Sequence, residues 1–362
     1  MKNSIVIITG GTGGHVIPAE IFFNYISSKN ENTYLISDKR GFKYIKDKKN
    51  LKIFKINASH FSGNLKFKIY ALIKLFVGFF QSIKILYTIK PKIVISFGSY
   101  ASFTPLLCVL FSKKIFKTEL YIHEQNSVIG QVNKIFLKFS NKIFLNFEIN
   151  YNLKKKFFKK LIIVGLPQQK KINKDFVEKY NSKSINFLVF AGSQGSLEIL
   201  DFLKKILSKI ELQSIKKNIK FIIQCPLLKQ NEIKNLLTKK KLDFQIKDFF
   251  KNFEEILSDT HIALCRSGAG TINDLIKHKI PAILCPLSHA KDNHQYENAK
   301  VLSDTNCAII LDSHKINFLE VTTFIIKVID DKNFNKSLIT NYNKIKIHNA
   351  NELMWNIIKN EQ

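Results

Sequence analysis

Short β-rich apolar runs alternate with longer helical patterns along the whole chain of 362 residues. This alternation is typical of parallel sheets, in which each strand is joined to the next through a helix that covers one face. The runs fall into two series, so two sheets are expected. The first series predicts strands at residues 4–9, 33–37, 93–96, 120–123 and 142–145, and the second at residues 187–190, 221–224, 244–246, 262–265, 282–285 and 308–311.

Residues 150–184 separate the two series. They hold a lysine run, a short apolar run and residues 165–167 (GLP), which are typical of a crossing between domains. The chain also exceeds the common domain size of about 100–150 residues. We predict an α/β fold of two Rossmann-like doubly wound domains, residues 1–164 and 165–339. A cleft is expected between them, because ligands of open parallel sheets bind at the carboxyl ends of the strands.

The chain is strongly basic, with 57 Lys and Arg against 28 Asp and Glu and a formal net charge of +29. Such a charge suits a nucleic-acid binder, since clustered cations displace counterions from phosphates. However, Arg40 and Arg266 are the only two arginines, and lysine is spread over the whole sequence. We interpret most of the charge as a drift of composition towards lysine, so nucleic acid is not expected as a partner.

Two features bear on the cellular compartment. The five cysteines are odd in number, show no Cys-x-x-Cys spacing and lie mostly in apolar runs, so buried reduced thiols in a cytosolic protein are expected. The first residues predict a strand that enters a glycine loop rather than a signal peptide. No stretch of about 18 uncharged apolar residues occurs, so no membrane-spanning segment is expected.

The strongest local signal is residues 10–15 (GGTGGH), directly after the first predicted strand. Glycines let the backbone turn sharply and approach a ligand, and Pro18 suits the first turn of a helix, so the loop is expected to aim a helix amino terminus at the cleft. It matches neither a dinucleotide fingerprint nor a phosphate loop that ends in Lys-Ser/Thr. His15 would favour its neutral, basic form there. The alternative is a tight turn needed only for packing.

Further loops follow other predicted strands. Residues 191–196 (AGSQGS) and 266–271 (RSGAGT) combine glycines with polar groups, and the second opens a helix that contains Asp274. Amides at a helix start form a phosphate seat, to which Arg266 would add charge, while Asp274 would accept hydrogen bonds from ribose hydroxyls. Residues 286–299 offer consecutive amide and imidazole groups that suit a hydroxyl-rich ligand such as a sugar.

Two assignments stay open at this point. His289, Asp292 and His294 are a conceivable metal site, but no other cluster of ligands in the sequence supports it. Residues 123–126 (HEQN) follow another predicted strand, and their His-Glu pair is either catalytic or a hydrogen-bonded corner.

The motifs GGTGGH, HEQN, GSQG, RSGA and KDxxQYxNA occur in the order and at about the separations seen in the MurG family, which the chain resembles over essentially its whole length. Its members are undecaprenyldiphospho-muramoylpentapeptide β-N-acetylglucosaminyltransferases of bacterial peptidoglycan synthesis. The resemblance implies a GT-B fold, with a final helix within residues 340–362 that crosses back to the first domain. It also implies transfer of N-acetylglucosamine from UDP-GlcNAc to the C4 hydroxyl of the muramoyl sugar of lipid I. Lipid II forms with inversion and without a metal or other cofactor.

The resemblance further implies the site residues. Inverting transfer needs a base for the acceptor proton and a group that stabilises the departing UDP. His15 is the expected base, with Glu124 and Tyr100 as helpers or competitors. The expected substrate contacts are Thr12, Gly13, Gly14, Asn126, Gln169, Ser193, Gln194, Phe250, Arg266, Ser267, Gly268, Ala269, Gly270, Thr271, Ile272, Asn273, Asp274, Gln295 and Asn298. The sequence departs from the family pattern where Gln169 replaces an arginine and Asp274 a glutamate.

A lipid acceptor implies contact with a membrane. Residues 65–87 combine apolar side chains with Lys66, Lys68, Lys74 and Lys84, and such a basic amphipathic stretch can lie among anionic headgroups. We therefore expect a peripheral protein on the cytoplasmic face of the bacterial inner membrane. The alternative for this stretch is a core-facing helix with solvated lysines. For the whole chain, the alternatives are another GT-B glycolipid synthase that uses a UDP-sugar, and a basic nucleic-acid-binding protein.

Overall fold

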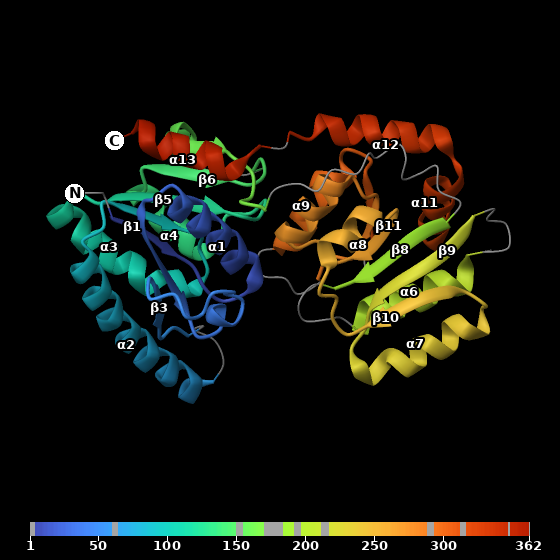
Figure 1. The fold of residues 1–362 in the computed structure, drawn as a ribbon, viewed down its shortest axis with the longest axis horizontal. Coiled ribbons are helices and arrows are strands. Elements are labelled where there is room, and N and C mark those ends of the chain that lie inside the picture. Colours follow the sequence, from blue (N-terminus) through green and yellow to red (C-terminus); the bar gives the residue numbers. More distant parts are fainter. Residues whose placement is uncertain are drawn as a thin grey trace. The chain divides into compact units, whose positions relative to one another are not determined.

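The computed structural model describes residues 4–59, 64–149, 155–169, 184–191, 197–210, 217–287, 293–311, 316–346 and 348–361. The chain forms two compact units (Figure 1). Unit 1 comprises Met1–Gln169 together with His348–Gln362, and unit 2 comprises Lys170–Ile347. Each unit is built on its own parallel sheet, so the predicted fold class is confirmed.

Unit 1 contains a sheet of seven strands in the order β3-β2-β1-β4-β5-β6-β7, and every neighbouring pair is parallel. The strands are β1 (Ser4–Ile8), β2 (Asn32–Asp38), β3 (Ile53–Ile56), β4 (Ile93–Ser96), β5 (Glu119–Glu124), β6 (Lys142–Leu145) and β7 (Leu161–Ile163). The sequence pattern does not predict β3 and β7, the two edge strands. Their residues are mostly only partly buried, so neither forms the long apolar run of a central strand.

Helices cover both faces of this sheet, as the alternation along β1 indicates. The α-helices of unit 1 are α1 (Gly13–Ser28), α2 (Leu65–Ile89), α3 (Phe103–Phe116), α4 (Gln131–Phe136) and α13 (Ala350–Asn360). Ile5 and Ile7 share one buried cluster with residues of α1 and α13. Val6 and Ile8 share another with residues of α2 and α3. Because successive side chains of a strand point to opposite faces, β1 is apolar throughout and lies between two helical layers.

Helix α1 begins earlier than the sequence pattern predicts. We expected Pro18 in its first turn, but α1 starts at Gly13, and the amides of His15 and Val16 lie 3.1 and 3.2 Å from the Thr12 carbonyl oxygen. The prediction for Pro18 is wrong because the glycine-rich segment itself adopts the helical conformation. His15 therefore lies in the first turn of the helix, directly beside the loop that follows β1.

The C-terminal region divides between the units. Helix α12 (Lys332–Lys344) belongs to unit 2, whereas α13 belongs to unit 1. The Glu361 carboxylate accepts a hydrogen bond from the Tyr121 hydroxyl at 3.0 Å and pairs with Lys142 at 3.2 Å. These contacts tie the end of the chain to β5 and β6 of the first sheet.

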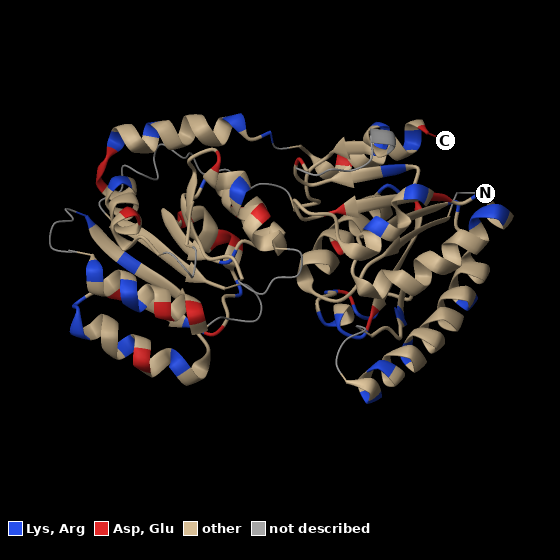
Figure 2. Cartoon of the chain, turned by 180° about the vertical axis from the view of Figure 1, so that it is seen from behind, with Lys and Arg blue, Asp and Glu red and all other residues tan. Residues whose placement is uncertain are grey.

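Helix α2 packs on unit 1 through a narrow stripe of mostly small residues. Its buried residues are Ala71, Gly78, Ser82 and Leu86. A Cβ atom on Gly78 would overlap with the Asn57 carbonyl oxygen, so only glycine allows this approach. Figure 2 shows blue lysines along α2 and no acidic residue. By length and composition alone α2 could cross a membrane, contrary to the sequence-based expectation that the chain has no such segment.

Unit 2 contains six strands in the order β10-β9-β8-β11-β12-β13, again with every pair parallel. The strands are β8 (Ser184–Phe190), β9 (Asn218–Gln224), β10 (Asp243–Lys247), β11 (Ile262–Cys265), β12 (Ala282–Leu284) and β13 (Ala308–Ile310), which confirms the second predicted series. The remaining helices are α6 (Leu197–Lys209), α7 (Leu227–Lys239), α8 (Phe253–Asp259), α9 (Ala269–His278), α10 (His294–Ser303) and α11 (Phe318–Asp330). All five cysteines of the chain are buried and free, as the sequence indicates.

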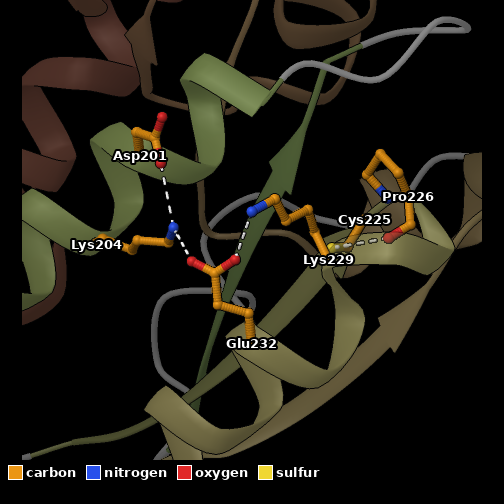
Figure 3. Close-up of polar contacts among 6 residues, drawn as sticks. All are labelled: Asp201, Lys204, Cys225, Pro226, Lys229 and Glu232. Carbon is orange, nitrogen blue, oxygen red and sulfur yellow. Dashed lines mark hydrogen bonds and ion pairs between the residues drawn. The ribbon is translucent and has the colours of Figure 1, made fainter.

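Polar contacts fix α6 against α7 in unit 2. Glu232 of α7 accepts hydrogen bonds from Lys204 of α6 and, at 2.7 Å, from Lys229, and Lys204 also reaches Asp201 at 3.2 Å (Figure 3). The hydrogen bond from Lys204, followed by that from Lys229, lowers the pKa of Glu232 to about 2. Helix α6 begins at Leu197, directly after residues 192–196, which lie outside the described residues.

Candidate active site

The glycine loop of unit 1 is held at its start by a carboxylate. Gly11 has a φ of +77°, which favours glycine, and its amide donates to Asp38 Oδ1 at 2.8 Å. A Cβ atom on Gly10 would also come within 2.8 Å of the same oxygen, so the loop passes too close to Asp38 for a side chain there. The loop leaves Thr12 and Gly14 exposed at the start of α1.

Asp38 joins three segments that are far apart in the sequence. Besides Gly11, its buried carboxylate accepts from the Gly41 amide at 2.8 Å and from the Tyr100 hydroxyl at 2.7 Å. Sequence reasoning missed this residue. The only available signal was an acidic residue at the end of a predicted strand.

Tyr100 lies over this carboxylate as a hydrogen-bond donor. Burial and the hydrogen bond to Asp38 raise the pKa of Tyr100 well above its ordinary value, although the guanidinium of Arg40, 5.9 Å from the ring centroid, acts in the opposite direction. Tyr100 therefore keeps its proton at neutral pH. This geometry fits a positioning role better than that of a general base.

His15 is half-buried in the first turn of α1 and points back into unit 1. Its Nδ1 lies 2.9 Å from the Phe97 carbonyl oxygen and 2.7 Å from Oε1 of Gln125. Phe97 directly follows β4 and Gln125 directly follows β5, so two neighbouring strands of the sheet position the imidazole. The residue expected to be the base is thus held through one ring nitrogen, which leaves Nε2 for chemistry.

Glu124 has the hydrogen bonds of a structural corner. Its buried carboxylate accepts from the amides of Asn126 and Gly130 at 3.1 and 2.8 Å, and from Nδ2 of Asn133 at 2.8 Å. These bonds close the loop between β5 and α4, and a further contact to Nδ2 of Asn126 at 3.3 Å orients that side chain. Of the two readings of the HEQN pair, the contacts of Glu124 favour the corner.

His123 is fully buried and sits behind the candidate base. Its ring stacks on Phe97 with centroids 4.9 Å apart, and its Nε2 lies 2.9 Å from the Gly165 carbonyl oxygen. Burial, with a smaller contribution from His15, lowers the pKa of His123 to about 4. His123 is therefore neutral at physiological pH, and sequence reasoning assigned it no separate role.

In unit 2, the start of α9 is linked to the start of α10. Gly268 precedes the first helical residue, and Ser267 donates its hydroxyl to the Gln295 carbonyl oxygen at 2.8 Å. Nδ2 of Asn298 donates to the Ser267 carbonyl oxygen at 3.1 Å, and Oε1 of Gln295 accepts from the Leu287 amide at 2.9 Å. Hydrogen bonds therefore link Ser267, directly before α9, to Gln295 and Asn298 of α10.

Arg266 donates hydrogen bonds to a carboxylate and two carbonyl oxygens of unit 2. Its guanidinium donates to Glu198 of α6 at 2.6 Å and to the carbonyl oxygens of Cys285 and Pro286 at 3.0 and 3.3 Å. This fork connects α6, β11 and the end of β12. The contacts favour a role for Arg266 in shaping the loop rather than in adding charge to the phosphate seat.

The first turns of α9 hold the remaining candidates, Gly270, Thr271, Ile272, Asn273 and Asp274. A Cβ atom on Gly270 would meet nothing within 4 Å among the described residues, so packing does not require a glycine there. Burial, and then the charge of Glu254, raise the pKa of Asp274 to about 7, while Lys277 acts in the opposite direction. Ile272 is buried, and Nδ2 of Asn273 caps the Ala269 carbonyl oxygen at 2.8 Å.

Several candidates lie apart from these clusters or outside the described residues. Phe250 is buried beside the exposed Phe249. Gln169 is exposed at the end of unit 1. Ser193, Gln194 and the conceivable metal ligands His289 and Asp292 lie outside the described residues. Within the described ranges, no group of three or more His, Cys, Asp or Glu side chains could hold a metal ion.

Two doubly wound units, each on its own parallel sheet, give the two-domain fold, and the family models assign this fold to the glycosyltransferases. Residues 5–145 match the model of the glycosyltransferase family 28 N-terminal domain, and residues 186–354 match that of the family 28 C-terminal domain. The chain belongs to the MurG family, the UDP-N-acetylglucosamine--N-acetylmuramyl-(pentapeptide) pyrophosphoryl-undecaprenol N-acetylglucosamine transferases. The resemblance noted from the motifs is thereby confirmed.

The relatives cover nearly the whole chain. The transferase of Rickettsia canadensis is 30% identical over 329 residues, which span 90% of this chain and 91% of the relative. That of the Wolbachia of Drosophila simulans is 31% identical over 322 residues, which span 88% of each chain. The crystal structure of Acinetobacter baumannii MurG matches with a TM-score of 0.77 at 20% identity and covers 99% of this chain and all of the other, which supports the fold.

Proposed function

We propose that this protein transfers N-acetylglucosamine from UDP-GlcNAc to the C4 hydroxyl of the muramoyl sugar of lipid I, forming lipid II with inversion. Membership in the MurG family supports the donor and the acceptor. The observation that carries the chemical step is His15, held at the start of α1 by the Phe97 carbonyl oxygen and Gln125. An imidazole positioned in this way is a suitable general base.

The reaction requires three coupled changes at the sugar. A bond forms between the acceptor oxygen and C1 of N-acetylglucosamine, the bond from C1 to the UDP oxygen breaks, and the acceptor proton passes to Nε2 of His15. The glycine loop from Gly10 to Gly14 would let a substrate approach closely, because it carries almost no side chains, and Thr12, Gly13, Gly14 and Asn126 are expected to contact the donor. Asp38 and Glu124 would keep this loop and Asn126 in place through the hydrogen bonds described above.

Unit 2 would hold the donor. The amides at the start of α9, after Gly268, suit the diphosphate, and the helix dipole would stabilise the negative charge of the departing UDP. Asp274 would accept from the ribose hydroxyls, and Gln295 would bind the sugar. Asn298, expected as a substrate contact, is fully buried and bonded to the Ser267 carbonyl oxygen, so we assign it to holding the loop instead. Ser193, Gln194 and the Phe250 backbone would complete the donor contacts of unit 2. Gln169, which belongs to unit 1, would supply a neutral amide where the family pattern has an arginine.

Helix α2 would bring the enzyme to the acceptor's membrane on the cytoplasmic side. Its outer face exposes a band of large apolar side chains, namely Leu65, Phe67, Ile69, Tyr70, Leu72, Ile73, Phe76, Val77, Phe80, Ile83 and Tyr87. Residues 48–118, which contain α2, carry 13 lysines and no acidic residue. Apolar side chains flanked by lysines suit the interface of an anionic bilayer. Because its buried stripe packs on unit 1, we assign α2 a peripheral contact, and we assign the charge to lipid rather than to nucleic acid.

Vesicle flotation tests the membrane contact. We expect the protein to float with vesicles that contain anionic lipid and to float less with purely zwitterionic ones, because lysines add to the apolar binding. Phe76→Ser should weaken flotation, whereas Leu228→Ser, a matched change at an exposed leucine of α7, should leave it unchanged. Absence of the wild-type protein from both vesicle fractions, or equal losses for the two variants, would contradict the proposed contact.

An acceptor comparison tests the activity. UDP release from UDP-GlcNAc should depend on a lipid I analogue, and NMR of the product should give a β-linked N-acetylglucosamine on the muramoyl C4 oxygen. Diacylglycerol should not support release. Transfer to diacylglycerol but not to the lipid I analogue would favour another glycolipid synthase and overturn the proposal.

A further inference from the structure

A line of hydrogen bonds inside unit 1 connects the backbone of Gly165 to His15. Nε2 of His123 lies 2.9 Å from the Gly165 carbonyl oxygen, and Nδ1 of His123 lies 3.1 Å from Nε2 of Gln125. At the other end of the same amide, Oε1 of Gln125 lies 2.7 Å from Nδ1 of His15. Because each contact needs one donor and one acceptor, the fixed backbone groups determine where every proton in the line resides.

The carbonyl oxygen of Gly165 determines which ring nitrogen of His123 carries the hydrogen. A carbonyl oxygen can only accept, so Nε2 of His123 must carry a hydrogen. Complete burial disfavours a second proton on this ring, and the pKa of His123 is lowered to about 4. Nδ1 of His123 therefore presents a lone pair towards Gln125.

Two acceptors then fix the orientation of the Gln125 amide. Its Nε2 lies 3.1 Å from the Nδ1 lone pair of His123 and 3.2 Å from the His123 carbonyl oxygen. The NH2 group has two hydrogens and satisfies both, whereas a reversed amide would place an oxygen against two acceptors. Gln125 is buried, so such a reversal would find no water to compensate. Oε1 must therefore face His15.

By the same argument, Nδ1 of His15 carries the hydrogen. Its Nδ1 faces Oε1 of Gln125 at 2.7 Å and the Phe97 carbonyl oxygen at 2.9 Å, and both can only accept. We infer that Gln125, oriented by His123, is a positioning residue that holds His15 in the tautomer protonated at Nδ1. This tautomer leaves the lone pair on Nε2, and the inference rests on the proposed role of His15 as the base.

The arrangement suits both states of a base. When Nε2 takes up the acceptor proton, Nδ1 keeps its hydrogen and both of its contacts, so the ring need not turn during the reaction. The Gln125 oxygen also stabilises the imidazolium that forms. The titratable group on β5 that faces His15 through Gln125 is His123, and His15 contributes to lowering the pKa of His123. The charged residues beside the glycine loop, Asp38 and Arg40, contact Gly11, Gly41 and Tyr100.

The pH profile of kcat/KM tests the role of Gln125. Gln125→Glu should move the acid limb upward by about one to three pH units, because a carboxylate favours the charged imidazole. Gln125→Leu should move it downward and lower kcat/KM by about tenfold, the loss of one hydrogen bond. The matched changes Gln230→Glu and Gln230→Leu on α7 should leave the limb in place. If the acid limb moved in the same direction in both Gln125 variants, the inference would be overturned, because a purely structural role of Gln125 would give that result.

Histidine NMR separates this inference from the proposed function. In folded protein labelled with 15N at histidine, the resonances that disappear in His15→Ala belong to the ring of His15. Without substrate, and at a pH where this ring is neutral, we expect Nδ1 to be protonated and Nε2 to be unprotonated. Protonation at Nε2 instead would overturn the inference even if the enzyme is active. Failure of glycosyl transfer with the expected tautomer would overturn the proposed function and not the tautomer.

Discussion

Replacement of Asp38 should destabilise unit 1 in a graded way. Asp38→Ala removes the acceptor of the buried Gly11 and Gly41 amides, both bonded at 2.8 Å. An orphaned buried donor costs about 1–3 kcal/mol, so the two amides together cost about 2–6 kcal/mol in the free energy of unfolding. Asp38→Asn keeps one oxygen for the two amides, but its NH2 group cannot accept from the Tyr100 hydroxyl, so it loses the charge assistance and that bond, at about 1–3 kcal/mol. Tyr100→Phe removes one partly exposed bond and should cost about 1 kcal/mol.

The single tryptophan makes this measurement specific. Trp355 lies on α13 within the core of unit 1, so its fluorescence during urea unfolding reports that unit. We expect the order of stability to be wild type, then Tyr100→Phe, then Asp38→Asn, then Asp38→Ala. In activity assays the kcat/KM with a lipid I analogue should fall in the same order. Equal costs for the alanine and asparagine variants, or no cost for alanine, would refute the role assigned to the carboxylate.

Three further predictions concern unit 2. Gly270→Ala should raise thermal stability by up to about 1 kcal/mol, because alanine favours the helix and its Cβ has free space, and should weaken UDP-GlcNAc binding in calorimetry. The pKa of Asp274 is raised to about 7 from an ordinary 3.8, so the folded chain binds an extra proton between these values. The free energy of unfolding should therefore fall as pH rises through this window, and Asp274→Asn should remove that slope in urea titrations. The pKa of Glu232 is lowered to about 2, so its stabilisation is present above its ordinary 4.5 and lost towards pH 2. Glu232→Gln should lower the melting temperature in circular dichroism at pH 7 but not at pH 2.

The central strands and the loops after them could be predicted from the sequence, because both leave local signals. Strands buried on both faces, such as β1 and β11, read as continuous apolar runs. The edge strands β3 and β7 lack that run and were missed. Pro18 was misplaced because its preference for a first turn competed with a helix that the preceding glycines could already begin.

The roles of individual site residues could be predicted only in part. Asp38 acts on residues 3, 27 and 62 positions away, and no pattern in one sequence connects them. The same holds for His123, whose partner Gly165 is 42 positions away. Glu124 was left open between two roles because the HEQN motif gives its residue type but not its hydrogen bonds. Long-range contacts, rather than propensities, decide these roles.

The most direct test of the central claim compares turnover with donor binding in His15→Ala. Loss of a general base lowers turnover by about 10²- to 10⁴-fold, so kcat with a lipid I analogue should fall in that range. UDP-GlcNAc affinity, measured by calorimetry on the same preparation, should match the wild type, because His15 is not among the expected substrate contacts. Full turnover of His15→Ala, with an unchanged acid limb in its pH profile, would contradict the assignment of His15 as the base.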